Sequence, residues 1–334
     1  MASATLTAPS TAADHRPSAG REHRSLSDLP PLTTTVPRQY VHRTAVSEVF
    51  LTGWRRAGSG AWVVSAQWPR AHSFYGPVDG LHDPMLLVET MRQASILLAH
   101  VAHGVPLDHP IIWQDLRYSV NPEALRVTGA PAETELHITD HALLYRGRRL
   151  AGARLRFHVL RDGAELATAE LHFACQTPAV YRRLRGEYSD LQRANARTLD
   201  LAEPVAPRLV ARDRTNDVVL SPTGRANRWQ LRVNTAHPVL FDHPVDHAPG
   251  MLMVEAARQA AHAAAGPGFS LPADMECSFH RYGELDAPCW VEVTPGHDGR
   301  GRRLLDIDIQ QNGRSVFTAR TASRSTAGRS TPTG

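Results

Sequence analysis

The sequence predicts an α+β fold made of two similar units in one chain, each a curled antiparallel sheet around one apolar helix. The first observation is an internal repeat: residues 85–94 read MLLVETMRQA, residues 251–260 read MLMVEAARQA, and seven of the ten aligned positions are identical. The second is that the same order of expected strands surrounds both copies. Two copies indicate a duplicated domain and not a solenoid. We expect the two units to pair as a built-in dimer.

The bulk composition is that of a globular chain with two cores. The 334 residues are 42% hydrophobic and 21% charged, and the chain is long enough for two ordinary domains. There is no apolar run of about 20 residues that would span a membrane, and no stretch of signal-peptide type, so we expect a cytoplasmic protein. Three cysteines are too few for a disulfide framework or a zinc cluster. We expect Cys277 and Cys289 to be buried as small apolar residues.

The charge balance excludes some partners. All 37 basic residues are Arg, and the formal net charge is +4. That charge permits an anionic ligand or an acidic protein partner, but the chain lacks the basic stripe with interleaved aromatics that is typical of nucleic-acid binding. We expect Arg182, Arg183 and Arg185 to form a solvated face, with docking of an acidic acyl carrier protein as a further hypothesis.

The first unit is expected at residues 40–178, after a disordered tail at 1–39 that is rich in Ala, Ser, Thr and Pro. Two strands, at 47–51 and 61–68, precede a loop at 72–84. Asp83 can cap the central helix and Pro84 can take its first position, and the apolar pattern then runs to Ala102. Four further strands follow, at 111–120, 133–140, 149–160 and 165–175, with a hairpin turn at 161–163.

The second unit is expected at residues 211–323, after a linker at 179–210 with a helical stretch at 180–193. The predicted elements are strands at 217–221 and 228–234, a loop at 237–250, a helix at 251–265, and strands at 277–280, 289–294, 303–310 and 315–321. Asn312-Gly313 is typical of a hairpin turn. The remaining residues, 324–334, are expected to form a polar tail.

Both central helices carry charges on an otherwise apolar surface. Glu89, Arg92 and Gln93 share one side of the first helix, and residues 255, 258 and 259 repeat the same types on the second. A helix that is apolar nearly all round belongs inside a protein, where a charge is expensive unless it is paired. The simple interpretation is a salt bridge within each helix, with the glutamines bonded to neighbouring backbone. The alternative is a catalytic site.

The second repeat, with the loop before it, resembles the hotdog-fold hydroxyacyl-thioester dehydratases. His243, Pro249-Gly250, Glu255 and Gln259 occur in the order of that family's His-x-Pro loop, Pro-Gly turn and Glu–Gln helix. The resemblance implies that each unit is a hotdog domain, so that the chain is a tandem double hotdog.

A closer resemblance covers nearly the whole chain from about residue 40. GLHDPMLLVETMRQA, QDLRYSVNP at 114–122 and FDHPVDHAPGMLMVEAARQAA are together similar to the A-factor biosynthesis (AfsA-type) double-hotdog family. The resemblance implies synthesis of γ-butyrolactone, butenolide or furan signals that regulate antibiotic production. The implied reaction transfers a β-ketoacyl group from an acyl carrier protein thioester to dihydroxyacetone phosphate. It calls for no cofactor.

Acyl transfer of this kind needs a base, an oxyanion site and a phosphate site. Glu255 is the leading base, because burial on an apolar helix is expected to raise the pKa of its carboxyl group. Arg258 is expected to bind phosphate or developing negative charge, and His243 to be an acid–base partner. The first half supplies a second set, with Glu89 as the catalytic carboxylate. The expected substrate-binding residues are Arg92, Gln93 and Gln259.

Alternative functions stay open from the residues alone. A metal site at His243, Asp246 and His247 is disfavoured, because no third or fourth ligand is evident and the prolines make this segment a loop. A hotdog dehydratase or thioesterase, and an acyl-ligand binding module without turnover, both fit the fold. The sequence does not say which half is active, nor whether the chain forms a homodimer.

Overall fold

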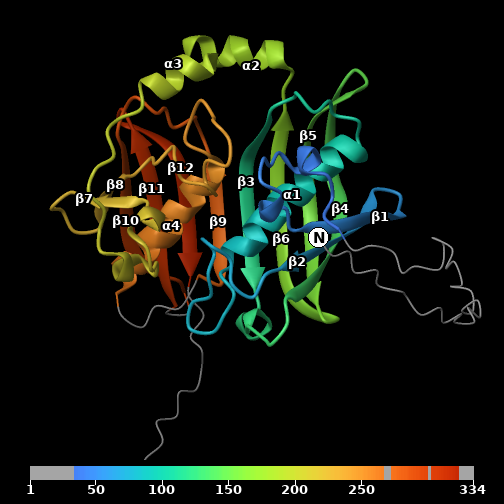
Figure 1. Cartoon of the computed structure of the whole chain (residues 1–334), viewed down its shortest axis with the longest axis horizontal. Helices are drawn as coiled ribbons and strands as arrows, with labels where there is room; N and C mark the ends of the chain where they lie inside the picture. Colours follow the sequence, from blue (N-terminus) through green and yellow to red (C-terminus); the bar gives the residue numbers. More distant parts are fainter. Residues whose placement is uncertain (1–33, 267–271, 300–301, 323–334) are drawn as a thin grey trace, which may run out of the picture. The chain divides into compact units, whose positions relative to one another are not determined.

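A computed structural model describes residues 34–266, 272–299 and 302–322 (Figure 1). From Thr35 onward these residues belong to one compact unit. Of the predicted tail at 1–39, residues 1–33 lie outside the described residues. The predicted tail at 324–334 lies outside them entirely. None of the helices in the described ranges has both the length and the hydropathy that crossing a membrane requires.

The first half has the predicted order of two strands, a helix and four strands. Its elements are η2 (Arg38–Val41), η3 (Val46–Glu48), β1 (Leu51–Gly58), β2 (Ala61–Trp68), α1 (Met85–Val101), β3 (Ile111–Val120), η4 (Pro122–Leu125), β4 (Ala132–Arg146), β5 (Arg149–Arg161) and β6 (Ala164–Cys175). Asp83 caps α1 as expected, since its Oδ1 accepts a hydrogen bond from the Met85 N–H at 2.9 Å.

The second half repeats this order. Its elements are η6 (Pro207–Val210), η7 (Thr215–Asp217), β7 (Leu220–Pro222), β8 (Arg228–Leu231), α4 (Gly250–Ala265), β9 (Asp274–Phe279), β10 (Cys289–His297), β11 (Arg303–Gln311) and β12 (Arg314–Ala322). The Asn312-Gly313 turn is confirmed, because both residues have the positive φ that a tight two-residue hairpin requires.

In the described part of the chain, twelve strands form one antiparallel sheet in the order β1-β2-β4-β5-β6-β3-β9-β12-β11-β10-β8-β7. The order is a palindrome of equivalent strands, with β3 and β9 at the centre. Leu116 of β3 pairs with Cys277 of β9, so a continuous ladder joins the two halves. The expected pairing of the two units is therefore confirmed.

Both repeat helices lie inside the curved sheet (Figure 1). In α1, 15 of the 17 residues are buried, and in α4, 11 of the 16 are buried. Apolar side chains of both helices and of the inward faces of the strands make up one continuous core. Cys277 and Cys289 are buried with a free thiol, as expected.

Several predicted strand boundaries were wrong, and three of them have a visible cause. The stretches predicted as strands at 47–51 and 217–221 each begin as a 3₁₀ turn, η3 and η7. In both, a helix glutamine takes up a backbone carbonyl: Gln93 donates to Glu48 O and Gln259 to Asp217 O, so neither carbonyl is available to a sheet partner. Strand β4 runs beyond residue 140 to Arg146, into an exposed hairpin with no buried face and hence no alternating pattern to mark it.

The linker between the halves is held against the second half. It contains α2 (Pro178–Arg185), η5 (Gly186–Ser189) and α3 (Leu191–Ala196). Arg182 and Arg183 are exposed, but the expectation of a solvated Arg185 was wrong. Its buried guanidinium lies 3.1 Å from Asp246 Oδ2 and 2.7 Å from Glu284 Oε2. Two carboxylates therefore fix the end of α2.

Candidate active site

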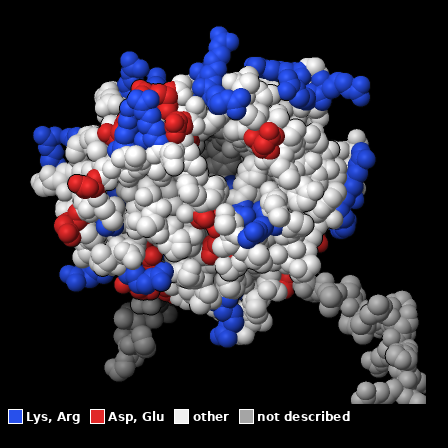
Figure 2. Space-filling model, turned by 45° about the horizontal axis from the view of Figure 1, so that its top comes forward, with Lys and Arg blue, Asp and Glu red and all other residues white. Residues whose placement is uncertain are grey.

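A cavity of about 670 Å³ is lined by residues of both halves. Its polar lining includes Arg92 of α1, His42 and Arg43 before β1, and the second-half loop at 239–250. Its apolar lining includes the start of β3 and Phe279 of β9. In Figure 2, the face that carries the linker helices is hollowed near its centre, and arginine side chains stand around the hollow.

The Glu89 carboxylate lies at the centre of a buried polar cluster beside this cavity. Arg92, one helical turn away, donates to both of its oxygens at 2.9 Å. Arg43, which is distant in sequence, lies 2.7 Å from Oε1, and the Gln93 amide donates to the same oxygen at 2.7 Å. One carboxylate thus holds two guanidinium groups in fixed positions.

The Glu255 carboxylate lies in a matching cluster. Arg258 donates to its oxygens at 2.9 and 2.8 Å, Arg212 lies 2.8 Å from Oε2, and the Gln259 amide donates at 2.6 Å. In both clusters each arginine also donates to a backbone carbonyl outside its own helix. These acceptors are Val41 for Arg92, Val239 for Arg43, Val210 for Arg258 and Phe74 for Arg212. Arg43 and Arg212 therefore each reach across to a loop of the opposite half.

The second cluster is closed by a further carboxylate. Asp83 of the first half, besides capping α1, accepts a hydrogen bond from Arg212 at 3.0 Å. The two acids, Asp83 and Glu255, balance the two arginines, and all four side chains are at most 3% exposed. None of the four lines the cavity.

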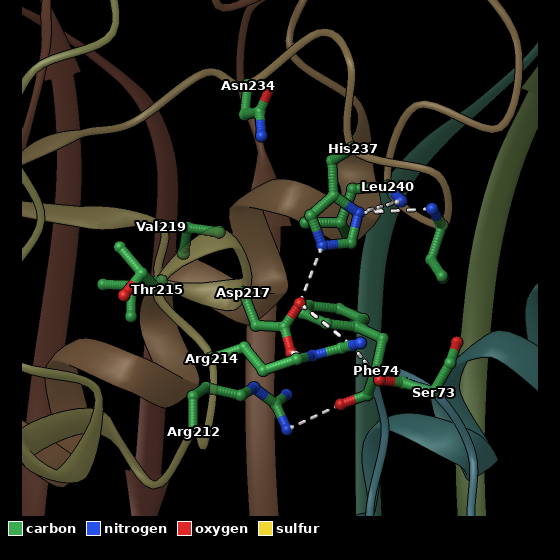
Figure 3. A network of polar contacts seen from close by, with 12 residues as sticks. Ser73, Phe74, Arg212, Arg214, Thr215, Asp217, Val219, Asn234, His237 and Leu240 are labelled. Atoms are coloured by element: carbon green, nitrogen blue, oxygen red, sulfur yellow. Dashed lines mark hydrogen bonds and ion pairs between the residues drawn. The ribbon is translucent and has the colours of Figure 1, made fainter.

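Loops of both halves surround Arg212 on one side (Figure 3). Arg214 pairs with Asp217 at 2.9 Å and also donates to the Ser73 carbonyl. The His237 ring lies 3.5 Å from Asp217 and accepts hydrogen bonds from the loop backbone. This second network ties the loops down over the closed cluster.

The first cluster stays open to the cavity. Glu89 is the acid paired with both Arg43 and Arg92, and the Arg92 side chain is 16% exposed and lines the cavity. Asp242 lies nearby, but its carboxylate accepts hydrogen bonds from the Thr44 and Ala45 backbone. Two guanidiniums that share one carboxylate beside a cavity form a site for an anion, because Arg presents several donors in fork geometry.

The expected rise in the pKa of Glu255 was wrong. Burial alone raises the pKa of a carboxyl group, but the charges of Arg212 and Arg258 outweigh it and lower the value to about 2. Arg43 and Arg92 likewise overcome the burial of Glu89 and lower its pKa to about 2. Both carboxylates are therefore held ionised as anchors for arginine, and neither lines the cavity, so neither is placed to take a proton from a substrate there.

The remaining predicted residues fall into two groups. Gln93 and Gln259 are buried away from the cavity lining, and each bonds to backbone as the simple interpretation predicted. His243 does line the cavity, with a side chain 44% exposed and its Nδ1 3.4 Å from Asp242. The structure thus brings His243 together with Arg92, across the boundary between the halves, and leaves Glu255 and Arg258 outside the cavity.

The N-terminus of α4 also faces this cavity. Pro249, Gly250 and Met251 all line it, and the first N–H groups of a helix have no partner within the helix. At the equivalent end of α1, Asp83 accepts the Met85 N–H. The open site therefore adds backbone donors from the second half to the arginines of the first.

Sequence analysis missed Arg43, Arg212, Asp83 as an ion-pair partner, and His42. One signal did exist: Val41-His42-Arg43 is echoed by Val210-Ala211-Arg212 at a constant spacing of 169 residues. Three residues with one mismatch are too short a repeat to stand out by themselves. The equivalence becomes visible only when each arginine is seen to reach the matching helix carboxylate.

The fold and the site together define a tandem hotdog protein in which one Glu–Arg cluster borders a cavity and its counterpart is buried. Residues 25–177 and 194–327 match the family model of the A-factor biosynthesis hotdog domain, and the chain belongs to that family. The expected tandem double hotdog is thereby confirmed.

Curated relatives match this chain over most of their length. A "2-oxo-3-(phosphooxy)propyl 3-oxoalkanoate synthase" of Streptomyces virginiae is 46% identical over 89% of this chain and 100% of its own. A synthase of the same name from Streptomyces griseus is 40% identical over 84% of this chain and 92% of its own. A solved structure, titled oleoyl thioesterase (putative) from Lactobacillus plantarum, is 10% identical with a TM-score of 0.51, over 78% of this chain and 96% of that one, and supports the fold alone.

Proposed function

We propose that this protein is an acyltransferase that moves a β-ketoacyl group from a thioester to dihydroxyacetone phosphate. The product named for its relatives, a 2-oxo-3-(phosphooxy)propyl 3-oxoalkanoate, is the ester of those two parts. The C–S bond of the thioester breaks, a C–O bond forms, and a thiol leaves. This ester would be the precursor of a butenolide or γ-butyrolactone signal, as the sequence resemblance implies.

The observation that carries the proposal is that one of the two arginine clusters borders the cavity and the other is buried away from it. Arg43 and Arg92 share the Glu89 carboxylate and line the cavity, so their guanidiniums are within reach of a ligand. A phosphate dianion accepts paired N–H donors from such groups. A simple thioesterase or dehydratase has no anionic second substrate and no need for this charge. We assign the phosphate to these arginines, with His243 at the cavity rim as a further contact.

The acyl part fits the apolar side of the same cavity. Ile111, Trp113, Phe279 and Met253 line it. The thioester oxygen would then lie at the N-terminus of α4, where the free N–H groups and the helix dipole stabilise a developing oxyanion. Phosphate and thioester would thus be held by opposite halves of the chain, with their reacting ends between them.

The thioester donor is proposed to be an acyl carrier protein. The exposed Arg182 and Arg183 on α2 lie in the linker, whose Tyr181 lines the cavity. A basic helix at that position suits an acidic carrier domain that delivers its acyl group by a flexible arm.

The test is mass spectrometry of the purified chain incubated with a β-ketoacyl carrier protein, with and without dihydroxyacetone phosphate. We expect a phosphorylated ester that appears only when both substrates are present. Release of free acid or of a dehydrated acyl group, with or without the phosphate, would instead establish a thioesterase or a dehydratase. Absence of any turnover with a carrier protein proven to be loaded would favour a binding module.

A further inference from the structure

We propose that His42 is the general base of this site and that its Nδ1 accepts the proton of the attacking hydroxyl group. The inference rests on the proposed acyl transfer and supplies the group that Glu89 and Glu255 do not. It follows from the hydrogen bonds that fix the His42 ring, from the place of the ring in the cavity, and from what replaces it in the closed half.

The hydrogen bonds determine which nitrogen of His42 is free. His100 Nδ1 lies 2.7 Å from the Val105 carbonyl, which can only accept, so this nitrogen carries the proton. In a neutral His100 the other nitrogen, Nε2, is then an acceptor. His42 Nε2 lies 2.9 Å from it and must be the donor. The Nδ1 of a neutral His42 is therefore left with a lone pair.

That lone pair is accessible from the cavity. His42 lines the cavity. Its Nδ1 has no hydrogen bond in the described part of the chain, and this atom is not fully enclosed by the protein. The rest of the ring is held in place, since it packs against His100 with ring centroids 5.0 Å apart. A fixed ring with one solvent-facing acceptor has the geometry of a base waiting for a substrate proton.

The surroundings keep His42 neutral. Burial, together with the charges of His100 and Arg92 of α1 and of His243 in the second-half loop, lowers its pKa to about 3. His42 therefore carries a free lone pair at any pH near neutrality. An incoming phosphate dianion would offset the positive charge of Arg92 and make the ring more basic when the substrate is present.

The closed half lacks both rings. The residue equivalent to His42 is Ala211, which has the same left-handed backbone with φ of 50°. The residue equivalent to His100 is Gly266, 166 residues further along the chain. The dyad therefore occurs in the half whose arginines face the cavity and is absent from the half whose arginines are sealed.

The resulting step balances without a co-reactant. His42 Nδ1 takes the hydroxyl proton of dihydroxyacetone phosphate as the oxygen attacks the thioester carbonyl carbon. The C–S bond then breaks, and the imidazolium returns the same proton to the leaving sulfur. The products are the ester and a free thiol, and His42 is neutral again. His100 is a positioning residue, which acts by holding the His42 tautomer.

The experiment measures steady-state ester formation by His42→Ala, with the thioester saturating and dihydroxyacetone phosphate varied. We expect kcat to fall by about 10²- to 10⁴-fold with little change in the KM for the phosphate, as is typical for loss of a general base. Added imidazole should restore part of the rate. His100→Gln should give a smaller loss and a changed pH profile. Circular dichroism would establish that both variants are folded.

The outcomes separate this inference from the proposed function. If the unaltered protein makes the ester and His42→Ala keeps its kcat within about threefold, or loses only phosphate affinity, His42 is not the base while the acyltransferase stands. If the unaltered protein makes no ester, both fall. The ¹⁵N resonances of His42 give an independent check on the chain as it is: a protonated Nδ1 at neutral pH would overturn the assignment without any variant.

Discussion

Two clusters of the same design, around Glu89 and around Glu255, have different surroundings in this molecule. Each has a helix glutamate that holds two arginines and a glutamine, and each ties its arginines to matching carbonyls. The second gains Asp83 and is buried completely, whereas the first gains His42 and opens to a cavity. The comparison teaches that the same Glu–Arg arrangement can be purely structural in one half and can border a ligand cavity in the other. Recurrence of a motif therefore does not mean recurrence of its function.

The strongest test of this difference between the clusters is to remove the charge of the Glu255 carboxylate in the closed cluster. Glu255→Gln leaves Arg212 and Arg258 buried with Asp83 as their acid partner, and loss of one member of a buried ion pair costs about 3–5 kcal/mol. We expect the free energy of unfolding in urea to fall by that amount. Product formation would fall with the folded fraction and would recover under conditions that restore folding.

Glu89→Gln is the matched control. Its arginines border a cavity, where water can solvate the freed charge, so the loss of stability should be smaller. Equal destabilisation by the two variants would contradict the view that one cluster is structural and the other is built for a ligand.

A second prediction concerns Arg92, on the open side. Arg92→Ala removes one of the two proposed phosphate contacts, and hydrogen bonds to charged groups contribute about 1.5–3 kcal/mol each. We expect kcat/KM for dihydroxyacetone phosphate to fall by roughly 10- to 150-fold, by the conversion of 1.4 kcal/mol per factor of ten. Arg148→Ala, at an exposed position of the turn between β4 and β5, is the control for loss of one positive charge. No difference between the two would remove the phosphate from this site.

Much of this contrast could not be predicted from the sequence. The repeat and its spacing were enough to predict the paired units, the central helices and the Glu–Arg pairs one turn apart, because these depend on local periodicity. Arg43 and Arg212 approach their carboxylates from positions 46 and 43 residues earlier in the chain. Local periodicity does not predict such contacts, and without them each carboxylate has at most one arginine to offset the effect of burial on its pKa. The expected rise in pKa failed for this reason.

The third prediction is acid sensitivity. The pKa values of Glu89 and Glu255 are lowered from 4.5 to about 2 in the folded protein. A lowered carboxyl pKa contributes stability that is present above the unfolded value and is lost as the pH falls toward the folded one. We expect the free energy of unfolding to decrease from about pH 4.5 to about pH 2. The decrease should be shallower in Glu255→Gln, and an unchanged slope in urea titrations at each pH would contradict the ion-pair assignment.

The smallest predicted effect tests the apolar wall of the cavity. A Cβ at Gly250 would lie 3.3 Å from Phe279 and 3.6 Å from Trp113. We expect Gly250→Ala to raise the KM for the acyl thioester a few-fold without loss of stability, because alanine favours a helix by up to about 1 kcal/mol over glycine. Gly129→Ala is the control, since a Cβ there meets no atom within 4 Å. Unchanged acyl KM would place the acyl chain elsewhere.

The ladder between β3 and β9 also bears on how the chain folds. Leu116 and Cys277 pair across it although 161 residues separate them. During translation β3 is finished long before β9 exists, so the first half exposes an unpaired strand edge that is prone to aggregate. Closing so long a loop slows folding. The covalent linker keeps the awaited strand at a high effective concentration, independent of how much protein the cell makes, which two separate subunits would not provide.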